Sequence, residues 1–183
     1  MFLAALTVFS LAACNDSSTN ATTASSDSAN SSINSNANNS EEAKEERNKQ
    51  TVLASIKAGN NGDMEAVYKD YDKDMVDYGE GSMAPVKNLD SAKAGSKTFI
   101  AAFPDFKGSD LVAVADDDYV MVYGTWSGTW KGDMMGQKAT GKSVTFKDVD
   151  IYKFNDAGKI IEHRAVQSLN NITRQLGMKM PSQ

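Results

Sequence analysis

The sequence is poor in the residues that most often bind metals. Its 183 residues include one cysteine and one histidine. A single cysteine excludes an intramolecular disulfide, and one cysteine with one histidine excludes the Cys and His clusters of zinc, haem and iron–sulfur sites. A metal site made of carboxylates alone stays open, but no pattern in the sequence supports one. We therefore expect no metal ion and no other cofactor.

Runs of basic residues are also missing. The chain has 19 Lys and Arg against 24 Asp and Glu, which gives a formal net charge of -5. Nothing in this distribution would attract nucleic acid or an anionic membrane surface, so we expect no nucleic-acid partner. With 40% hydrophobic residues in 183 positions, the chain has room for one ordinary domain with a core.

An apolar run at the N-terminus predicts export. Residues 1–13 read MFLAALTVFSLAA and end just before Cys14. The run is too short to span a bilayer but has the length of the apolar part of a signal peptide. The letters LAAC resemble the lipobox of bacterial lipoproteins, in which cleavage before the cysteine leaves a thiol that becomes diacylated.

We therefore expect residues 1–14 to be a lipoprotein signal peptide together with a lipidated Cys14. The protein would then be held by its lipid in the bacterial cell envelope, either periplasmic or surface-exposed. No Lys or Arg precedes Cys14, which favours a translation start upstream of Met1. The alternative is a buried or truncated apolar segment without a targeting role.

Residues 15–40 consist almost entirely of Ser, Asn, Thr and Ala, with Ile33 as their one large apolar residue. Such a segment cannot bury enough surface to offset the entropy of ordering it, so we expect a disordered tether. As a random coil its ends would lie roughly 25 to 30 Å apart. This leaves residues 41–183 for the globular domain.

Helices are expected in the first part of that domain. The segment EEAKEERNKQTVLASIKAGNNGD opens polar and then places Val52 and Ile56 at helical spacing before a glycine-containing stop. Residues 63–71 predict a second, short helix with an aspartate as its N-cap. Residues 88–103 predict a third helix, because the proline that follows them disfavours helical geometry in the residue before it.

From residue 109 onward, apolar and polar residues alternate as they do in strands. Residues 109–130 predict two strands around the acidic turn DDD. Residues 142–154 and 159–169 predict two more around the turn NDAG. The expected class is therefore α+β, with N-terminal helices packed on a curved antiparallel sheet.

The letters GQKATGKS at residues 136–143 match the P-loop pattern that binds nucleotide phosphates. A P-loop lies between a buried parallel strand and a helix whose N-terminus faces the phosphates. Here Ser143 is followed by VTFKDVDIY, which alternates as a strand does. We therefore interpret the match as chance and expect residues 142 and 143 to lead from a hairpin loop into a strand.

Three segments in the second half of the chain carry a resemblance to a known family. They read GTWKGDMMGQKATGKSVTF, YKFNDAGKIIEHR and RQLGM, in this order. Together with the three helices before them, they resemble the SnoaL-like polyketide cyclases of the nuclear transport factor 2-like superfamily over about residues 45–178. The resemblance implies a cone-shaped α+β barrel, in which a curved sheet wraps a long helix and leaves an apolar pocket at its open end.

The resemblance also implies where family chemistry would lie. In the family, a His in a G-T-H stretch and an Asp ahead of the final Q-L-G perform acid–base work near a substrate enolate. The corresponding positions here are Trp130 and Ser168, and a family Trp position falls on Arg164. Trp has no titratable group and a Ser hydroxyl is a poor base without help, so we expect these cyclase residues to be replaced. Ser168 stays a candidate catalytic residue.

Two aspartates on one predicted strand are the other catalytic candidates. If Asn155 lies opposite Lys159, then Asp150 lies opposite Arg164, and Asp148 points to the same face. Such an Asp–Arg pair would orient a polar ligand group or activate a water; the alternative is a cross-strand ion pair that only stabilises the hairpin. His163 would then point to the opposite face, as a surface or subunit-interface residue. A register slip of one residue would exchange these faces.

Aromatic and sulfur-containing side chains are the candidates for an apolar pocket. Flexible thioethers and amphipathic rings suit an adaptable pocket, although ordinary core packing is the alternative for each of them. The expected ligand-binding residues, with the arginine as polar handle, are Phe103, Trp126, Trp130, Met134, Phe146, Tyr152 and Arg164.

Three functions follow from these residues. The first is a membrane-anchored lipoprotein whose domain binds a small apolar or amphipathic molecule. The second is a divergent ester cyclase, isomerase or hydrolase with Asp150 or Asp148 as its base and no metal. The third is an interaction module that works as a homodimer.

Overall fold

The structure is a computed structural model, and it describes residues 27–179, with side chains from residue 39 onward. The predicted signal peptide, Cys14 and residues 15–26 of the predicted tether lie outside the described part of the chain. The lipid anchor therefore stays a prediction. Within residues 27–179, no helix is long and apolar enough to cross a membrane.

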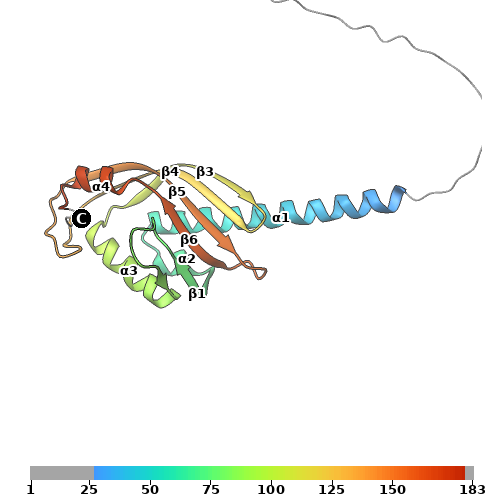
Figure 1. Cartoon of the computed structure of the whole chain (residues 1–183), viewed down its shortest axis with the longest axis horizontal. Helices are drawn as coiled ribbons and strands as arrows, with labels where there is room; N and C mark the ends of the chain where they lie inside the picture. The colour runs from blue at the N-terminus through green and yellow to red at the C-terminus, as the bar shows by residue number, and fades with distance from the viewer. Residues whose placement is uncertain (1–26, 180–183) are drawn as a thin grey trace, which may run out of the picture.

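The fold is α+β, as the sequence predicted: helices pack against one curved sheet of six strands (Figure 1). The helices are α1 (Asp27–Asn60), α2 (Met64–Tyr68), α3 (Leu89–Ala102) and α4 (Leu169–Leu176). The strands are β1 (Tyr71–Asp77), β2 (Val86–Lys87), β3 (Lys107–Asp116), β4 (Tyr119–Thr129), β5 (Ser143–Phe154) and β6 (Ile160–Val166). Their order across the sheet is β2-β1-β6-β5-β4-β3.

Helix α1 is longer than the sequence predicted. It begins at Asp27, whereas composition predicted disorder over residues 15–40, so the prediction was wrong for residues 27–40. The N-terminal part of α1 projects beyond the sheet (Figure 1). Once a helix has been nucleated, each further residue gains a hydrogen bond at little cost. Composition does not capture this effect, because it treats the segment as isolated from the helix that follows.

The C-terminal half of α1 is held by the core. Val52 is fully buried and Ile56 is nearly so, both in contact with the inner face of β4, β5 and β6. At the other end of the sheet, Lys44 reaches the tip of the β3–β4 hairpin, where its Nζ lies 2.8 Å from an Oδ1 of Asp117. The helix therefore lies along the concave side of the sheet, as the resemblance implied.

Strand β1 makes the sheet mixed rather than antiparallel. The sequence predicted a helix as far as residue 71, but α2 ends at Tyr68 and Tyr71 begins β1, which pairs in parallel with β6. The N-cap of α2 is confirmed, since Asp63 accepts a hydrogen bond of 3.0 Å from the backbone N–H of Ala66. Local pattern favoured helix here, and pairing with a strand some 90 residues later overrides it.

The P-loop-like segment is a hairpin loop. Residues 136–142 belong to the connection between the antiparallel strands β4 and β5, and Ser143 is the first residue of β5. No helix begins there, so the backbone N–H groups that a P-loop aims at phosphates are not arranged for that task. The interpretation of the motif as chance agrees with this structure.

A β-bulge sets the register of the last hairpin. The N–H of Asn155 donates to the carbonyl of Lys159 at 2.9 Å, so the predicted turn is correct. Phe154 pairs with Ile160, but Lys153 pairs with Glu162. Ile161 is therefore an extra residue on β6. A bulge of this kind reverses the faces of all residues beyond it. It decides which side chains meet in the site described next.

Candidate functional site

A cavity of about 730 Å³ lies between the inner face of the sheet, α3, α4 and the loop that follows β4. Six aromatic side chains line it: Phe99, Phe103, Phe106, Trp126, Phe146 and Tyr152. Strands β1, β5 and β6 contribute four titratable side chains to the wall: Asp77, Asp148, Asp150 and His163. Four methionines also line the cavity: Met83, Met134, Met135 and Met178.

Most of the sequence-predicted pocket residues line this one cavity. They come from the end of α3, from the inner faces of β4 and β5 and from the loop between those strands: Phe103, Trp126, Met134, Phe146, Tyr152, Asp148 and Asp150. The structure therefore brings the predicted apolar wall and the two predicted acids together. Three predicted residues lie elsewhere, namely Trp130, Ser168 and Arg164.

Trp130 belongs to the core and not to the cavity wall. Its exposure is 1%, and it packs in a cluster with Ala102, Phe103, Val144 and Leu176. The indole Nε1 donates to the carbonyl oxygen of Gly132 at 2.6 Å. β4 ends one residue before Trp130, and the side chain belongs to the same buried cluster as Leu176 of α4. The prediction that it binds ligand was wrong.

Ser168 has a structural role. It is the N-cap of α4, and its hydroxyl accepts a hydrogen bond of 3.4 Å from the N–H of Asn171. The residue is exposed and does not line the cavity. N-caps prefer Ser because its oxygen satisfies an N–H that the first helical turn leaves free. Ser168 is therefore placed to start a helix, and the prediction of a catalytic role was wrong.

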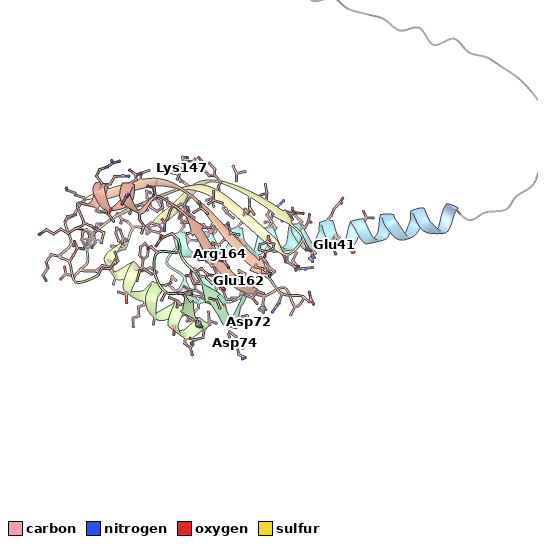
Figure 2. All side chains as sticks on the ribbon, in the orientation of Figure 1. Glu41, Asp72, Asp74, Lys147, Glu162 and Arg164 are labelled. Carbon is pink, nitrogen blue, oxygen red and sulfur yellow. The ribbon has the colours of Figure 1, made fainter. Side chains whose placement is uncertain are left out.

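Arg164 lies on the outer side of the sheet. The bulge pairs Asp150 with Ala165 and places Arg164 opposite Ile151. The guanidinium stacks 3.7 Å from the ring centre of Tyr78. It also lies 3.1 Å from the carboxylate of Glu162 on the same strand, and Figure 2 labels both Arg164 and Glu162. The predicted Asp–Arg pair does not form, and Arg164 is not the polar handle of the cavity.

His163 occupies the place that was expected for the arginine. Its Nδ1 lies 2.9 Å from an oxygen of Asp77, and its Nε2 lies 3.2 Å from an oxygen of Asp150. An ionised carboxylate only accepts hydrogen bonds, so both ring nitrogens must carry protons and the imidazole is charged. We call these three residues the carboxylate clamp. The sequence prediction of an outward-facing histidine was wrong, because it lacked the bulge.

The pKa values agree with a charged clamp. Burial alone would lower the pKa of His163, but the hydrogen bonds and charges of Asp150 and Asp77 raise it to about 10. Burial would raise the pKa of Asp77, but the bond to His163 and that charge lower it overall. The N–H of Gly79 adds a hydrogen bond of 2.8 Å to the same carboxylate oxygen. At neutral pH the clamp is therefore a cation held between two anions.

Asp77 could not be found from the sequence. It lies at the end of β1, and it reaches the site because β1 pairs with β6 and sets Asp77 opposite His163. Pairing between segments so far apart leaves no local signal. The contact between Asp77 and His163 could be predicted only if the parallel pairing of β1 with β6 were already known.

Asp148 has a different environment from its neighbours in the clamp. Its exposure is 6%, and its Oδ1 is buried without a hydrogen-bond partner among the residues described. Burial and then the charge of Asp150 raise the pKa of Asp148 to about 6. A carboxyl with a pKa near neutrality can both take and return a proton at physiological pH. Asp148 is thus the best placed of these groups for acid–base chemistry.

Residues 27–179 hold no cluster of three or more His, Cys, Asp and Glu side chains arranged to bind a metal ion. The clamp contains two carboxylates, but both face the same imidazolium, which occupies the space between them.

A family model described as SnoaL-like polyketide cyclase matches residues 49–176. Among solved structures, AclR, a proposed hydroxylase from Streptomyces galilaeus, is 28% identical with a TM-score of 0.61, and the match covers 75% of this chain and 99% of that one. No curated protein matches the chain.

Two further structures share the fold. A proposed SnoaL-like polyketide cyclase from Jannaschia sp. CCS1 is 21% identical with a TM-score of 0.67, over 74% of this chain and 95% of that one. IdmH, a proposed polyketide cyclase from Streptomyces antibioticus, is 24% identical with a TM-score of 0.57, over 72% and 99%. These two likenesses show the architecture alone.

Proposed function

This chain belongs to the SnoaL-like polyketide cyclase family, and we propose that its cavity binds a small, largely apolar carbonyl compound and that Asp148 transfers a proton there. The observation that carries the proposal is the state of Asp148: a buried carboxyl in the cavity wall, with a pKa raised to about 6 and one oxygen without a partner. An enzyme with an aspartate base was the second of the functions that the sequence predicted, after simple binding.

The shape and composition of the cavity support binding of a polyketide-like molecule. A volume of about 730 Å³ lies within the range of small-molecule sites. Flat aromatic walls suit planar rings, and Phe106 and Trp126 already stack on each other with 5.8 Å between ring centres. Relatives are described as polyketide cyclases, and polyketides combine apolar rings with carbonyl groups. We propose the same class of ligand for this protein.

The chemistry would be removal of a proton from the carbon next to a carbonyl. Such a reaction needs a base whose pKa is close to the working pH, held where water cannot compete. Asp148 meets the first condition through burial and through Asp150. Exchange of that proton, isomerisation and aldol-type ring closure all begin with this step, so one acid–base residue supports each of them.

The test uses 2-acetonaphthone, a planar ketone with exchangeable protons beside its carbonyl. Proton NMR in D₂O follows loss of its methyl signal with and without the protein. We expect exchange above the buffer rate, rising with pH through a single ionisation near 6. Arg164→Ala serves as the control and should exchange within twofold of wild type, because Arg164 lies outside the cavity. Binding without any exchange would contradict the proposed proton transfer.

Binding without turnover is the second candidate. Trp130 and Ser168 hold the positions that the resemblance gives to the acid–base residues of the family, and they serve the core and a helix cap instead. A protein that has lost those groups could retain the cavity as a carrier site. In that case the probe would bind with no exchange at any pH.

We also propose that the protein forms a homodimer through the outer sheet face. This face is the side of β3, β4 and β6 away from the cavity, and it exposes Val112, Val114, Met121, Tyr123 and Val166. Cross-strand pairing sets Val114 beside Met121 and Val112 beside Tyr123, so the apolar side chains form one patch. Contiguous exposed apolar surface of this kind usually marks an interface.

Met121→Glu is expected to convert the dimer into a monomer. Met121 lies in the middle of the patch, and burying a carboxylate there without a partner would outweigh the apolar contacts that remain. Size-exclusion chromatography with light scattering measures the mass. Met83→Glu is the matched control, because Met83 is 69% exposed and lies at the cavity rim. A wild-type protein that elutes as a monomer would contradict the interface.

We propose further that Cys14 carries a lipid and holds the protein in the cell envelope. The support is the apolar run followed by LAAC in the sequence. In a bacterial host, wild type should partition into the detergent phase of Triton X-114, and Cys14→Ser should remain in the aqueous phase. A wild-type protein found in the aqueous phase would contradict the anchor.

A further inference from the structure

Two buried polar atoms without partners belong to side chains on the inner faces of neighbouring strands. One is the Oδ1 of Asp148, an acceptor, and the other is the indole Nε1 of Trp126, a donor. Both residues line the cavity. Buried polar atoms are nearly always hydrogen-bonded, so an unpaired donor and an unpaired acceptor in the wall of one cavity point to a ligand that supplies both partners.

Strand pairing explains why these side chains are neighbours. Gly124 lies directly opposite Asp148 on the adjacent strand, and Trp126 follows two residues later on the same face. The indole extends over Gly124. Its Nε1 lies 3.8 Å from the position that a Cβ of Gly124 would take. The N–H edge of the ring is thus brought toward the strand position of Asp148.

The indole is held in this orientation by its other edge. Its six-membered ring lies over Gly108, where an added Cβ would come within 2.7 Å of the ring. Its face stacks on Phe106 with an angle of 10° between the two planes. A glycine on each side and an aromatic face fix the ring, so its donor is preorganised in the way that catalytic donors must be.

Another candidate donor in the wall, His163, is already in use. Both ring nitrogens of His163 are engaged by the carboxylates of Asp77 and Asp150. The imidazolium is therefore a fixed charge in the background and does not offer an N–H to a ligand. Between these two residues, the indole N–H is the donor that a substrate oxygen beside Asp148 can reach.

We propose that Trp126 is a catalytic residue that donates its indole N–H to the carbonyl oxygen of the substrate. The proposal rests on the proton transfer proposed for Asp148. Asp148 takes the proton from the carbon next to the carbonyl, and the electron pair of that C–H bond becomes the new C=C bond. The former C=O π pair moves to the oxygen, where the N–H of Trp126 stabilises the negative charge. Asp148 then returns a proton to the carbon, which re-forms the ketone and regenerates the carboxylate; in D₂O the proton on Asp148 is replaced by a deuteron before this step.

Indole resonances in a ¹H–¹⁵N NMR spectrum test this contact in the wild-type protein. The chain has two tryptophans, and the second provides an internal reference, since Trp130 Nε1 is already bonded to Gly132. The probes are 2-acetonaphthone and naphthalene, which share the ring system and differ in the carbonyl. We expect the ketone to move the N–H proton of Trp126 downfield, naphthalene to move it much less, and Trp130 to move with neither.

Trp126→Phe gives a second and independent measurement. Phe keeps an aromatic face for Phe106 and removes the donor. The affinity for 2-acetonaphthone should fall about fivefold, the effect of one hydrogen bond between neutral groups, while the affinity for naphthalene stays within twofold. The rate of proton exchange at saturating ketone should fall further than the affinity, because the charge on oxygen grows in the transition state.

The outcomes separate this inference from the proposed function. If the ketone binds and exchanges its protons while the Trp126 resonance does not move, Trp126 is not the donor and the role of Asp148 stands. If the Trp126 resonance moves but no exchange occurs, the indole only orients a ligand, and both the catalytic role and the proton transfer are wrong. If neither probe perturbs the cavity, both proposals are overturned.

Discussion

Asp148→Asn is expected to lower the rate of proton exchange by a hundredfold or more and, at the same time, to make the protein more stable at pH 8. The first effect follows because an amide cannot take up a proton, and a positioned base contributes about 10² to 10⁴ in rate. The second follows because the ionised carboxyl is buried with one oxygen unpaired. A functional group that costs stability is a common feature of active sites.

The direction of the pH dependence follows from the raised pKa. The pKa of Asp148 rises from an ordinary value of 3.8 to about 6 in the folded protein. Between these two values the folded state binds more protons than the unfolded state, so stability falls as the pH rises through 6. Asn does not titrate, so the variant avoids this loss. The gain should be about 3 kcal/mol at pH 8 and about 0.5 kcal/mol near pH 4.

Urea denaturation at pH 4.5 and at pH 8 measures this difference, and proton exchange of 2-acetonaphthone measures the activity. Asp150→Asn is the matched control on the same strand, and it should be less stable than wild type at both pH values, because it removes one of the two acceptors of His163. A variant at position 148 that loses stability at pH 8 would contradict the unpaired state of the carboxyl.

The periodicity of the sequence predicted the fold because most of its elements are local. The predicted helices over 41–60 and 88–103 and the two hairpins appear at nearly the predicted places. Residues 74–81 showed only a short extended piece, and the parallel pairing of β1 was missed because a short strand at a parallel junction has no alternation of its own to read. Its identity depends on β6, which lies far along the chain.

Some features of the site depend on the alternation of side chains along one strand, whereas others depend on the register between two strands. Side chains at positions 146, 148, 150 and 152 share a face because strands alternate, and all four line the cavity as expected. The partner on β6 depends on register, and one bulged residue, Ile161, exchanged Arg164 for His163. Neither glycine nor proline marks this bulge, so no local signal predicts it.

The same exchange changes the expected chemistry of the cavity. An inward Arg164 would have offered a cation to an anionic ligand head. With the arginine outside, the charged groups that strands β1, β5 and β6 contribute to the wall are three aspartates and one imidazolium. The cavity is therefore better suited to a neutral carbonyl compound than to a carboxylate. A change of one residue in register thus alters the class of ligand and not only the names of the residues that bind it.

His163→Gln is expected to destabilise the protein by about 3 kcal/mol at pH 7. The substitution removes a cation that faces two carboxylates, and breaking a buried charge pair by removing one partner costs about 3 to 5 kcal/mol. The lower end applies, because the side chain of Asp77 keeps 33% exposure and water can solvate it in part. Gln keeps a polar donor of similar reach, so the loss reports the missing charge more than a missing contact.

The pH dependence of this loss identifies the charge on His163. Its pKa is about 10 when folded against an ordinary value of 6.5, so the stabilisation is complete below pH 6.5 and disappears as the pH rises through 10. Denaturation curves for both proteins should therefore converge between pH 7 and pH 10.5, whatever other groups titrate in common. Two curves that stay parallel over this range would mean that His163 is neutral, and the clamp would then be an ordinary hydrogen-bonded histidine with no fixed charge beside Asp148.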